Sequence, residues 1–289
     1  MIVVTGATGN VGRPLVRALA AAGERVTAVS RGITAADVPE GVRPIRADLA
    51  DPESLRPAFD GADALFFHDT GAGAHLLNPQ DILDAAKAGG VRRVVLLSSI
   101  GVASRSDSES HGGTGLALDR AVRQSGMDWT VLRAGGFASN AYAWAESVRT
   151  RRTVAAPFAG VGLPVVDPDD IAEVAAAALR EDGREEARAG RNAGQVHELT
   201  GPALTTPRQQ AEALGEALGE PVRFVELTRE QARAHMLAFM PAPVAETTLT
   251  ILGEPNEAEL RISPAVERIL GRPPRAFADW ARRHIAAFQ

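Results

Sequence analysis

The first half of the chain alternates short apolar runs with segments of helical periodicity. The apolar runs are rich in Val, Ile, Leu and Ala at consecutive positions, which is typical of parallel strands buried on both faces. They lie at Ile2–Val4, Arg25–Arg31, Val42–Ala47, Ala62–Phe67, Arg93–Leu97 and Trp129–Arg133. The helical segments include Pro14–Ala22, Leu76–Ala88 and Leu116–Gln124. Strands that alternate with helices in this way predict an α/β fold built on a doubly wound parallel sheet.

The regular alternation ends near residue 138. Beyond it the pattern predicts helices at Ser139–Arg152, Asp169–Arg180 and Thr206–Leu218, and short strands at Thr153–Pro157, Leu163–Val166, Gln195–Leu199 and Val222–Glu226. The last stretch, 229–289, is mostly helical with Pro and Gly breaks. We therefore predict a sheet domain of residues 1–137 that also receives 152–182 and 195–200. A smaller, mostly helical lobe of residues 138–152 and 201–289 would close over it.

The first strand runs directly into three glycines, Gly6, Gly9 and Gly12, and then into the first helix. Glycines let backbone N–H groups approach a diphosphate closely, and the helix dipole favours its negative charge. A tight turn that binds nothing is the alternative. The position between a strand and a helix, at the start of a βα series, is nevertheless the context that a dinucleotide site requires. The sequence therefore predicts a Rossmann dinucleotide-binding domain.

The end of the second strand distinguishes NAD from NADP. An acidic residue there accepts a hydrogen bond from the free 2′-hydroxyl of NAD, whereas an arginine suits the 2′-phosphate of NADP. This strand ends in Ser30-Arg31-Gly32, which offers one guanidinium and no carboxylate. The prediction is NADP(H) bound through Arg31, and an ordinary surface arginine is the alternative.

Composition excludes several classes of protein. The 289 residues carry a formal net charge of −5 without a basic run, which argues against a nucleic-acid partner. The absence of Cys excludes disulfides, thiolate metal sites and cysteine catalysis, and the six His show no metal-ligand spacing. No apolar run reaches the roughly 18 residues of a membrane span. The first strand begins at residue 2, so we expect no signal peptide, no membrane partner and a cytoplasmic location.

Several motifs match a known family in order along the chain. They are Gly6-Ala-Thr-Gly-Asn-Val-Gly12, Leu96-Leu97-Ser98-Ser99, Ser125-Gly-Met-Asp-Trp-Thr-Val-Leu-Arg133 with the following Gly-Phe-x-x-Asn140, Asp167-Pro-Asp-Asp170, and Gly271-Arg-Pro-Pro274 with Phe277 and Trp280. The chain resembles the NmrA-like and quinone-oxidoreductase-like group of atypical short-chain dehydrogenase/reductases over essentially its whole length. The motifs are more specific for fold and cofactor than for reaction.

The resemblance implies which residues hold the cofactor. The pyrophosphate would lie against Gly6, Thr8, Gly9, Asn10, Val11 and Gly12, and the 2′-phosphate against Arg31. Asp48 and Leu49 would bracket the adenine, although a turn-stabilising role for Asp48 is the alternative. The nicotinamide end would be lined by His68, Ser98, Gly135, Gly136 and Phe137.

The catalytic set of ordinary short-chain reductases is incomplete here. Those enzymes use a Ser together with a Tyr four residues before a Lys, and the Lys lowers the Tyr pKa so that it can protonate the substrate oxygen. The only Tyr is Tyr142 and the only Lys is Lys87, so this sequence cannot build the pair. Gly115 and Asp119 occupy the two positions, and Asp119 is expected to be a solvated helix residue.

Two candidate catalytic residues are left. Ser99 follows the fifth strand and would hydrogen-bond a substrate oxygen, although a capping role is the alternative. His111, in the polar, glycine-rich loop 104–115, titrates near neutrality and is a candidate general acid, as is His68. Tyr142 and Trp144 would line a pocket for a flat aromatic substrate, unless they belong to the core.

These features favour an NADPH-dependent reductase that transfers hydride to a small aromatic ketone or quinone without the Tyr-x-x-x-Lys pair. Positioning would supply most of the acceleration. The alternative is a regulatory protein that senses NADP(H) without chemistry, as NmrA-like members do. Isomerisation or imine reduction is a third option, because a fold does not fix a reaction.

Overall fold

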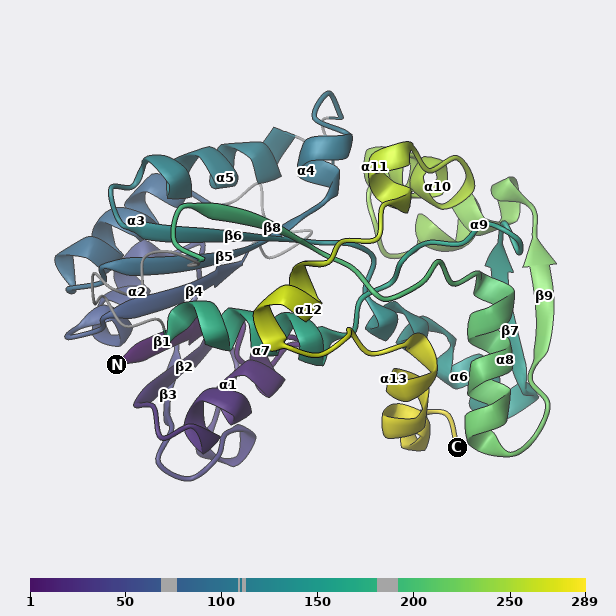
Figure 1. The fold of residues 1–289 in the computed structure, drawn as a ribbon, viewed down its shortest axis with the longest axis horizontal. Coiled ribbons are helices and arrows are strands. Elements are labelled where there is room, and N and C mark those ends of the chain that lie inside the picture. The colour runs from purple at the N-terminus through teal and green to yellow at the C-terminus, as the bar shows by residue number, and fades with distance from the viewer. Residues whose placement is uncertain (69–76, 109, 111–112, 181–191) are drawn as a thin grey trace.

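The apolar runs of the first half pair side by side in a parallel sheet (Figure 1). The computed structural model describes all residues except 69–76, 109, 111–112 and 181–191. Within the described residues the sheet has seven strands in the order β3-β2-β1-β4-β5-β6-β8. Their bounds are β1 (Ile2–Thr5), β2 (Val26–Ser30), β3 (Arg43–Arg46), β4 (Ala64–His68), β5 (Arg93–Ser99), β6 (Asp128–Ala134) and β8 (Gln195–Leu199). This order confirms the doubly wound Rossmann sheet, in which the strand order reverses between β1 and β4.

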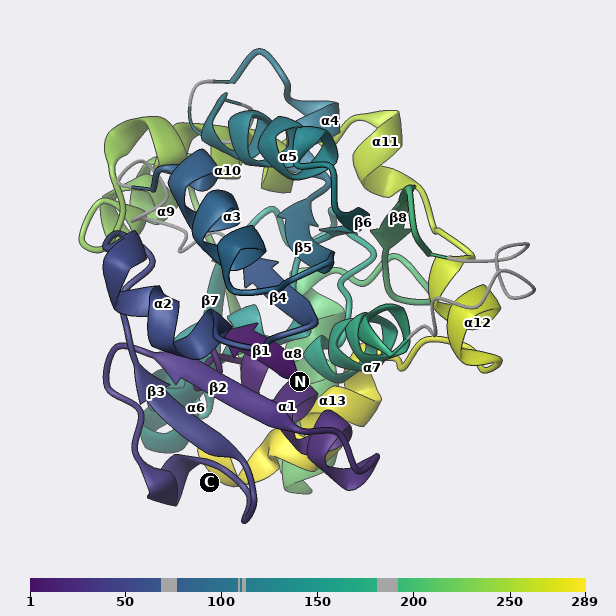
Figure 2. The ribbon, with the colours of Figure 1, turned by 90° about the vertical axis from the view of Figure 1, so that its left-hand side faces the viewer.

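Helices cover both faces of the sheet (Figure 2). On one face lie α1 (Gly12–Ala21), α7 (Pro168–Leu179) and α12 (Ala265–Leu270), and on the other α2 (Pro52–Phe59), α3 (Pro79–Ala88) and α5 (Thr114–Gln124). Successive strand residues enter opposite clusters, so that Val94 packs with the second set of helices and Val95 with the first. Each strand is therefore buried on both sides, which explains its continuous apolar sequence.

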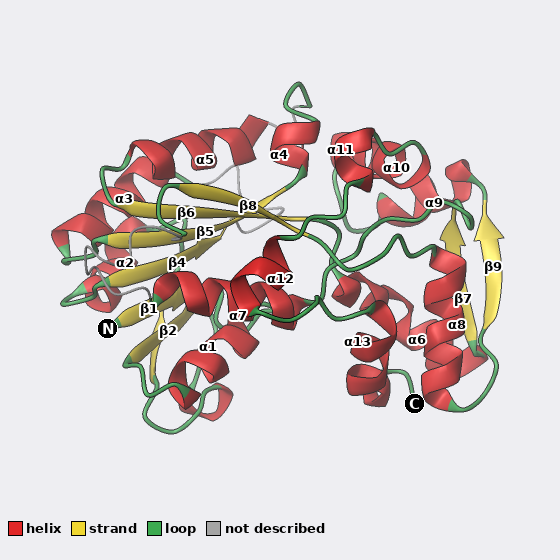
Figure 3. Ribbon diagram, viewed as in Figure 1, coloured by secondary structure: helices red, strands yellow, loops and turns green. Residues whose placement is uncertain are grey.

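The remaining elements form the smaller lobe on the right of Figures 1 and 3. They are a 3₁₀ helix η4 (Ala138–Trp144), α6 (Ala145–Arg151), β7 (Thr153–Pro157), α8 (Pro207–Leu218), β9 (Arg223–Leu227), α9 (Arg229–Met236), α10 (Ala242–Gly253), α11 (Glu257–Leu260), α13 (Phe277–His284) and a last 3₁₀ turn (Ile285–Ala287). Two short elements, a 3₁₀ turn (Ala35–Asp37) and α4 (Gly101–Ser104), belong to the sheet domain. A buried cluster around Trp280, Leu214 and Phe288 forms the core of the lobe. No helix of the described chain is long and apolar enough to cross a membrane.

Three predictions for the second half need correction. The range 152–182 was expected to join the sheet domain, but β7 pairs with β9 in a separate two-stranded sheet and only α7 returns. Leu163–Val166 forms isolated bridges, because Pro164 has no N–H and the N–H of Val165 turns back to the oxygen of Leu163 at 2.9 Å. The helix expected over 139–152 divides into η4 and α6. We propose the same two-part division with β7 moved to the lobe.

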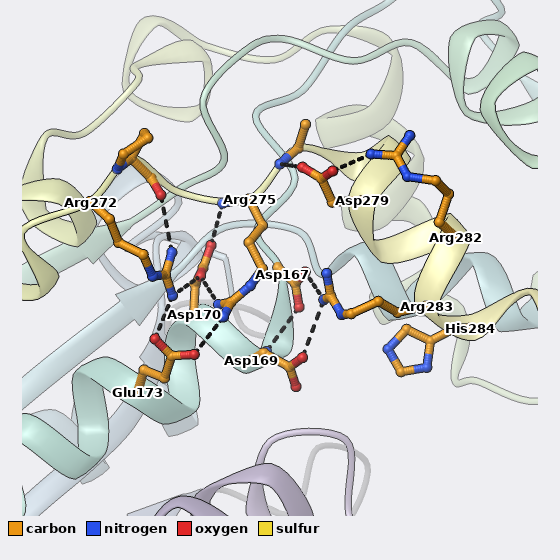
Figure 4. A network of polar contacts seen from close by, with 12 residues as sticks. Asp167, Asp169, Asp170, Glu173, Arg272, Arg275, Asp279, Arg282, Arg283 and His284 are labelled. Atoms are coloured by element: carbon orange, nitrogen blue, oxygen red, sulfur yellow. Dashed lines mark hydrogen bonds and ion pairs between the residues drawn. The ribbon is translucent and has the colours of Figure 1, made fainter. Parts of the chain in front are cut away.

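Four charged side chains tie the lobe to the start of α7 (Figure 4). Asp170 is fully buried and accepts hydrogen bonds from the Arg272 guanidinium at 2.8 Å and from the backbone N–H of Arg275 at 2.7 Å. The Arg275 guanidinium also contacts Asp170 and donates to Glu173 at 2.6 Å. Glu173 contacts Arg272 as well. We call Asp170, Glu173, Arg272 and Arg275 the α7 clasp.

The clasp favours the ionised form of Glu173. Burial by itself would raise the pKa of Glu173, but hydrogen bonds from Arg272 and Arg275 outweigh it and hold that pKa below its ordinary value. A lowered carboxyl pKa stabilises the fold above the ordinary glutamate value of about 4.3, and this stabilisation is lost as the pH falls through the lowered pKa. Because 272–276 leads directly into α13, the clasp also fixes where the lobe core lies against the sheet domain.

Replacing Asp170 by Ala should lower the free energy of unfolding by about 3–5 kcal/mol, since it leaves two guanidinium groups and one N–H without their buried acceptor. Urea unfolding followed by circular dichroism measures the change. Glu53→Ala is the matched control, because Glu53 pairs with Arg56 on the exposed face of α2 and should change little. An Asp170→Ala protein as stable as Glu53→Ala would show that the clasp does not hold the two parts together.

Candidate active site

The turn between β1 and α1 has no room for a side chain at Gly6 or at Gly12. A Cβ on Gly12 would lie 2.1 Å from the carbonyl oxygen of Gly6. Gly6 itself has a φ of +60°, and a Cβ there would lie 1.9 Å from Nε2 of His68. Gly9 donates its N–H to the same Gly6 oxygen at 2.9 Å and closes the turn. Helix α1 therefore starts directly against the end of β1, which only glycine permits.

The start of α1 offers backbone donors to a ligand. The helix begins at Gly12, and Val11 before it provides no side-chain cap. Within the described residues, no backbone oxygen accepts a hydrogen bond from the N–H of Val11 or Gly12. Unpaired N–H groups at the positive end of a helix dipole form an anion site. We call residues 6–12 the glycine cradle, and the contact of this cradle with a pyrophosphate stays a prediction.

The end of β2 lies beside the cradle. The Thr8 hydroxyl and the Ser30 hydroxyl are 2.9 Å apart, which joins the glycine turn to the residue before Arg31. Arg31 is exposed at this strand end. Arg13, in the first turn of α1, donates to the carbonyl oxygen of Thr8 at 3.4 Å. The strand end predicted for a 2′-phosphate is thus exposed and carries Arg31, whose contact with the phosphate stays a prediction.

The two residues expected at the adenine have structural roles. Asp48 Oδ1 accepts the N–H of Ala50 at 3.0 Å, which is the turn-stabilising alternative of the sequence analysis. Leu49 is buried in the core with α2 and α3, which leaves little of its side chain for a ligand. Their contact with adenine stays a prediction.

A cavity of about 350 Å³ opens at the carboxyl ends of β4, β5 and β6. We call it the strand-end cavity. It brings together six residues that the sequence predicted for the nicotinamide end or for catalysis. They are His68, Ser98, Ser99, Gly135, Gly136 and Phe137, joined by Leu97, Ala134 and Asn140. The side chains come from three neighbouring strands and from the turn after β6, so parallel strand ends explain their convergence.

A second cavity of about 270 Å³ shares one wall with the first. The common residues are Ser99, Ala134, Gly135, Gly136 and Asn140. Beyond them the second cavity is lined by Ile100, Gly101, Leu163, Pro164, Thr248, Ile251, Leu252 and Glu259. We call it the apolar cavity. It lies between the end of the sheet and the lobe helices α10 and α11, where a substrate would meet a dinucleotide held in the strand-end cavity.

The charged residue of the apolar cavity is neutralised by its neighbours. Glu259 accepts hydrogen bonds from Arg105 Nε at 2.8 Å, Arg105 Nη2 at 2.9 Å and the Ser104 hydroxyl at 2.9 Å. Burial would raise the pKa of Glu259, but these bonds and the N–H of Asn256 hold it below its ordinary value. Arg105 Nη2 also donates to the backbone oxygen of Glu254 at 3.1 Å, so Nε and Nη2 of Arg105 both have acceptors within the protein.

Ser99 is exposed at the end of β5. Its oxygen accepts the N–H of Gly101 at 3.1 Å, which is the capping role considered as its alternative. The hydroxyl proton is not used by that bond, so Ser99 still offers a donor to the two cavities. His111 lies outside the described residues. No group of three His, Asp or Glu that would hold a metal ion is found in the part of the chain that the structure describes.

Asp119 is not the solvated residue that we expected. Its side chain is 1% exposed and forms an ion pair with Arg133 of β6. Asp119 Oδ1 and Arg133 Nε have no hydrogen-bond partner among the described residues. Asp119 therefore serves to neutralise a largely buried arginine. Helix periodicity alone did not reveal this, because the partner comes from the next strand.

Tyr142 and Trp144 do not line either cavity at the strand ends. Tyr142 stacks on Phe288 and meets the edge of Trp280, and its hydroxyl lies 2.8 Å from Nδ1 of His284. Burial, together with Asp169, raises the pKa of Tyr142, which makes it a weaker proton donor. Trp144 packs against the same lobe core. Both aromatic side chains therefore pack on the lobe core, and Tyr142 also lines a separate cavity of about 340 Å³ beside Gly9 and Asn10.

Asn140 and the α10 residues of the apolar cavity were not predicted as site residues from the sequence. Asn140 was visible within a family motif, at a fixed distance after β6. Thr248, Ile251 and Leu252 gave no local signal, since apolar positions on a helix indicate a core equally well. They line the cavity because the lobe folds back over the strand ends.

Gly12→Ala should raise the Kd for NADPH at least about tenfold, because the helix must retreat from Gly6 and carry its N–H groups with it. Quenching of tryptophan fluorescence by added NADPH measures the Kd. Gly160→Ala is the control, since a Cβ there meets nothing within 4 Å. Equal affinities of the two variants would contradict the cradle.

Asp119→Ala should lower the free energy of unfolding by about 3 kcal/mol or more, because Arg133 is left as an unpaired buried charge. The double variant Asp119→Leu with Arg133→Met should recover most of the loss, since it removes both charges and keeps the volume. Urea unfolding of the two proteins makes the comparison. If the double variant were no more stable than the single one, the ion pair would not be the cause.

Comparison with known proteins places this geometry in a family. Residues 6–182 match a family model described as NAD(P)H-binding. The chain is 35% identical over 291 residues to a (4-alkanoyl-5-oxo-2,5-dihydrofuran-3-yl)methyl phosphate reductase of Streptomyces griseus subsp. griseus, with 100% of this chain and 99% of that protein covered. It is 32% identical over 293 residues to an NAD(P)H azoreductase of Xenophilus azovorans, with 100% and 99% covered.

Solved structures of the same fold include an NADPH-dependent quinone oxidoreductase of Escherichia coli complexed with NADPH. It has a TM-score of 0.77 and 23% identity, and 98% of this chain and 99% of that chain are covered. The negative transcriptional regulator NmrA has a TM-score of 0.73 and 19% identity, with 99% and 95% covered. The chain therefore belongs to the NAD(P)H-binding family, and it is an NAD(P)H-dependent oxidoreductase.

Proposed function

We propose that the protein is an NADPH-dependent reductase of a small, uncharged ketone or quinone. The observation that carries the proposal is the wall shared by the two cavities. On one side are the residues predicted for the nicotinamide, and on the other an apolar space of substrate size. A carbonyl group placed at this wall would meet the cofactor without crossing solvent.

The bound dinucleotide supplies a hydride, and the protein's task is to hold and orient the reactants. The glycine cradle and the start of α1 would hold the pyrophosphate. Gly135 and Gly136 present no side chain at the shared wall, so a flat ring can approach the backbone there. Ser99, which is exposed at the same wall, would donate a hydrogen bond to the substrate oxygen.

The walls of the apolar cavity favour an uncharged substrate. Four aliphatic side chains line the cavity, namely Ile100, Leu163, Ile251 and Leu252. The carboxylate of Glu259 is paired with the Arg105 guanidinium, so the two groups together present no net positive charge to an anionic substrate. A phosphate ester, such as the name of the Streptomyces griseus relative indicates, would lie beside that carboxylate. We therefore expect neutral carbonyl compounds, including aromatic ones, and not phosphate esters.

The second candidate is an NADP(H)-sensing regulator. The observation that favours it is the replacement of the Tyr and Lys of ordinary reductases by Gly115 and by Asp119, whose carboxylate is occupied by Arg133. Such a protein would keep the glycine cradle and Arg31 but would not need the apolar cavity. We prefer the reductase because the cavity adjoins the predicted nicotinamide site.

Steady-state oxidation of NADPH against a panel of quinones and aromatic ketones tests the reductase. We expect turnover, and we expect Ser99→Ala to lower kcat about 10- to 100-fold, the worth of one hydrogen bond to a developing charge. Ser106→Ala, an exposed serine of the neighbouring loop, is the control and should keep full activity. Tight NADPH binding without turnover on any member of the panel would favour the regulator.

Arg31→Ala should raise the Kd for NADPH about 10- to 100-fold and leave the Kd for NADH nearly unchanged, because only NADPH carries the 2′-phosphate. Fluorescence titration with both dinucleotides measures the ratio. Arg25→Ala is the matched control, since Arg25 is exposed just before the opposite end of the same strand. Equal losses for NADPH and NADH would contradict a role for Arg31 at the 2′-phosphate.

A further inference from the structure

We propose that Asn140 and Ser99 form a two-donor oxyanion site that binds the oxygen of the substrate carbonyl. The inference rests on the proposed function for the identity of that substrate. It assigns to Asn140 a catalytic role, and it replaces the missing Tyr and Lys by two neutral hydrogen-bond donors.

Ser99 and Asn140 both lie at the boundary between the two cavities. Five residues line both the strand-end cavity and the apolar cavity, namely Ser99, Ala134, Gly135, Gly136 and Asn140. Of these, only Ser99 and Asn140 have side chains that form hydrogen bonds. They come from separate elements, the end of β5 and the 3₁₀ helix η4. A carbonyl oxygen at the boundary between cofactor and substrate would therefore meet these two side chains.

The side chains of Asn140 and Ser99 both have a hydrogen-bond donor left for a ligand. The Asn140 backbone is fixed by its own N–H, which donates to the oxygen of Phe137 at 3.0 Å. Its side-chain amide is exposed and has no hydrogen-bond partner within the described part of the chain. Asn10, by comparison, donates its amide to the Ser139 hydroxyl at 3.2 Å. Ser99 accepts from Gly101, so its oxygen is held in place while its proton is left for a ligand.

The proposed reaction places negative charge on the substrate oxygen. Reduction of a ketone adds a hydride to the carbonyl carbon and moves the C=O electron pair onto oxygen, which becomes an alkoxide. Reduction of a quinone adds the hydride to one carbonyl oxygen and moves electron pairs through the ring onto the other oxygen, which becomes a phenolate. That oxygen then takes a proton from water to complete the alcohol or hydroquinone. The negative charge needs donors that are already in position. The ionised groups nearby are neutralised as pairs, Asp119 with Arg133 and Glu259 with Arg105, so the neutral donors Ser99 and Asn140 carry this task.

A spectroscopic probe tests the site without turnover. 4-Nitrophenol is bound to the protein saturated with NADP⁺, and its absorbance is followed over pH to give the ionisation constant of the bound phenol. An oxyanion site favours the phenolate, so the bound phenol should ionise at lower pH than the free one. Asn140→Ala should reduce the ionisation constant about tenfold, because one hydrogen bond to the charged oxygen is lost.

Variants of Asn140 distinguish the loss of a hydrogen-bond donor from the loss of side-chain volume. Asn140→Ala should lower kcat about 10- to 100-fold with an unchanged Kd for NADPH. Asn140→Asp should be slower still at neutral pH, since a carboxylate repels the developing oxyanion and donates no hydrogen bond. Gln124→Ala, an exposed amide at the end of α5, is the control and should match the wild type in both assays. Circular dichroism checks that each variant is folded.

The outcomes distinguish this inference from the proposed function. Turnover that is unaffected by Asn140→Ala, or a bound phenol whose ionisation does not depend on Asn140, overturns the oxyanion site and leaves the reductase standing. Failure of the wild-type protein to shift the ionisation of the phenol overturns the site as well. Absence of turnover with an Asn140-dependent phenol shift overturns the proposed reductase and supports the oxyanion site.

Discussion

The contact between the start of α1 and the end of β1 is the constraint on which the rest of the structure depends. Gly12 can approach the oxygen of Gly6 only because neither residue has a side chain. That approach directs the first N–H groups of α1 toward the edge where the strands end, and it places Thr8 beside the end of β2. The position of His68 follows from the same contact, since its ring lies against Gly6. The binding of a dinucleotide is thus a property of backbone packing, which explains why it is readable from three glycines and their spacing.

Buried charge determines how the second part of the chain meets the first. The α7 clasp joins two carboxylates of one helix to two arginines about a hundred residues later. Ion pairs of this kind add little stability over apolar packing, yet losing one partner is costly, so they define a geometry more than they strengthen it. The segment that carries the arginines continues into α13, whose Trp280 is central to the lobe core. The lobe in turn places α10 and α11 over the strand ends, and the apolar cavity exists because of that placement.

The same logic applies to the catalytic region. Where an ordinary short-chain reductase has a tyrosine and a lysine, this chain has a glycine and an aspartate, and the aspartate is buried against Arg133. Glu259 and Arg105 form a second neutralised pair at the rim of the cavity. The hydrogen-bonding side chains at the wall shared by the two cavities are the hydroxyl of Ser99 and the amide of Asn140. Such a site suits a reaction in which the cofactor supplies the reducing power and the protein stabilises the developing charge.

The sequence by itself determined the sheet, its strands and the nucleotide-binding turn, because each depends on residues that are neighbours in the chain. The continuous apolar runs, the glycines and Arg31 needed no knowledge of distant contacts. It did not determine that Asp119 is buried, that β7 pairs with β9 outside the main sheet, or that Tyr142 belongs to the lobe core, since each depends on a partner from another part of the chain.

Asn140 is the clearest case. Its residue type and motif were visible, but its place between two cavities arises only when η4, β5 and the lobe are folded together. The local sequence pattern specifies what is bound. The tertiary structure decides which side chains contact the substrate, because a site at strand ends is built from loops that are far apart in the sequence.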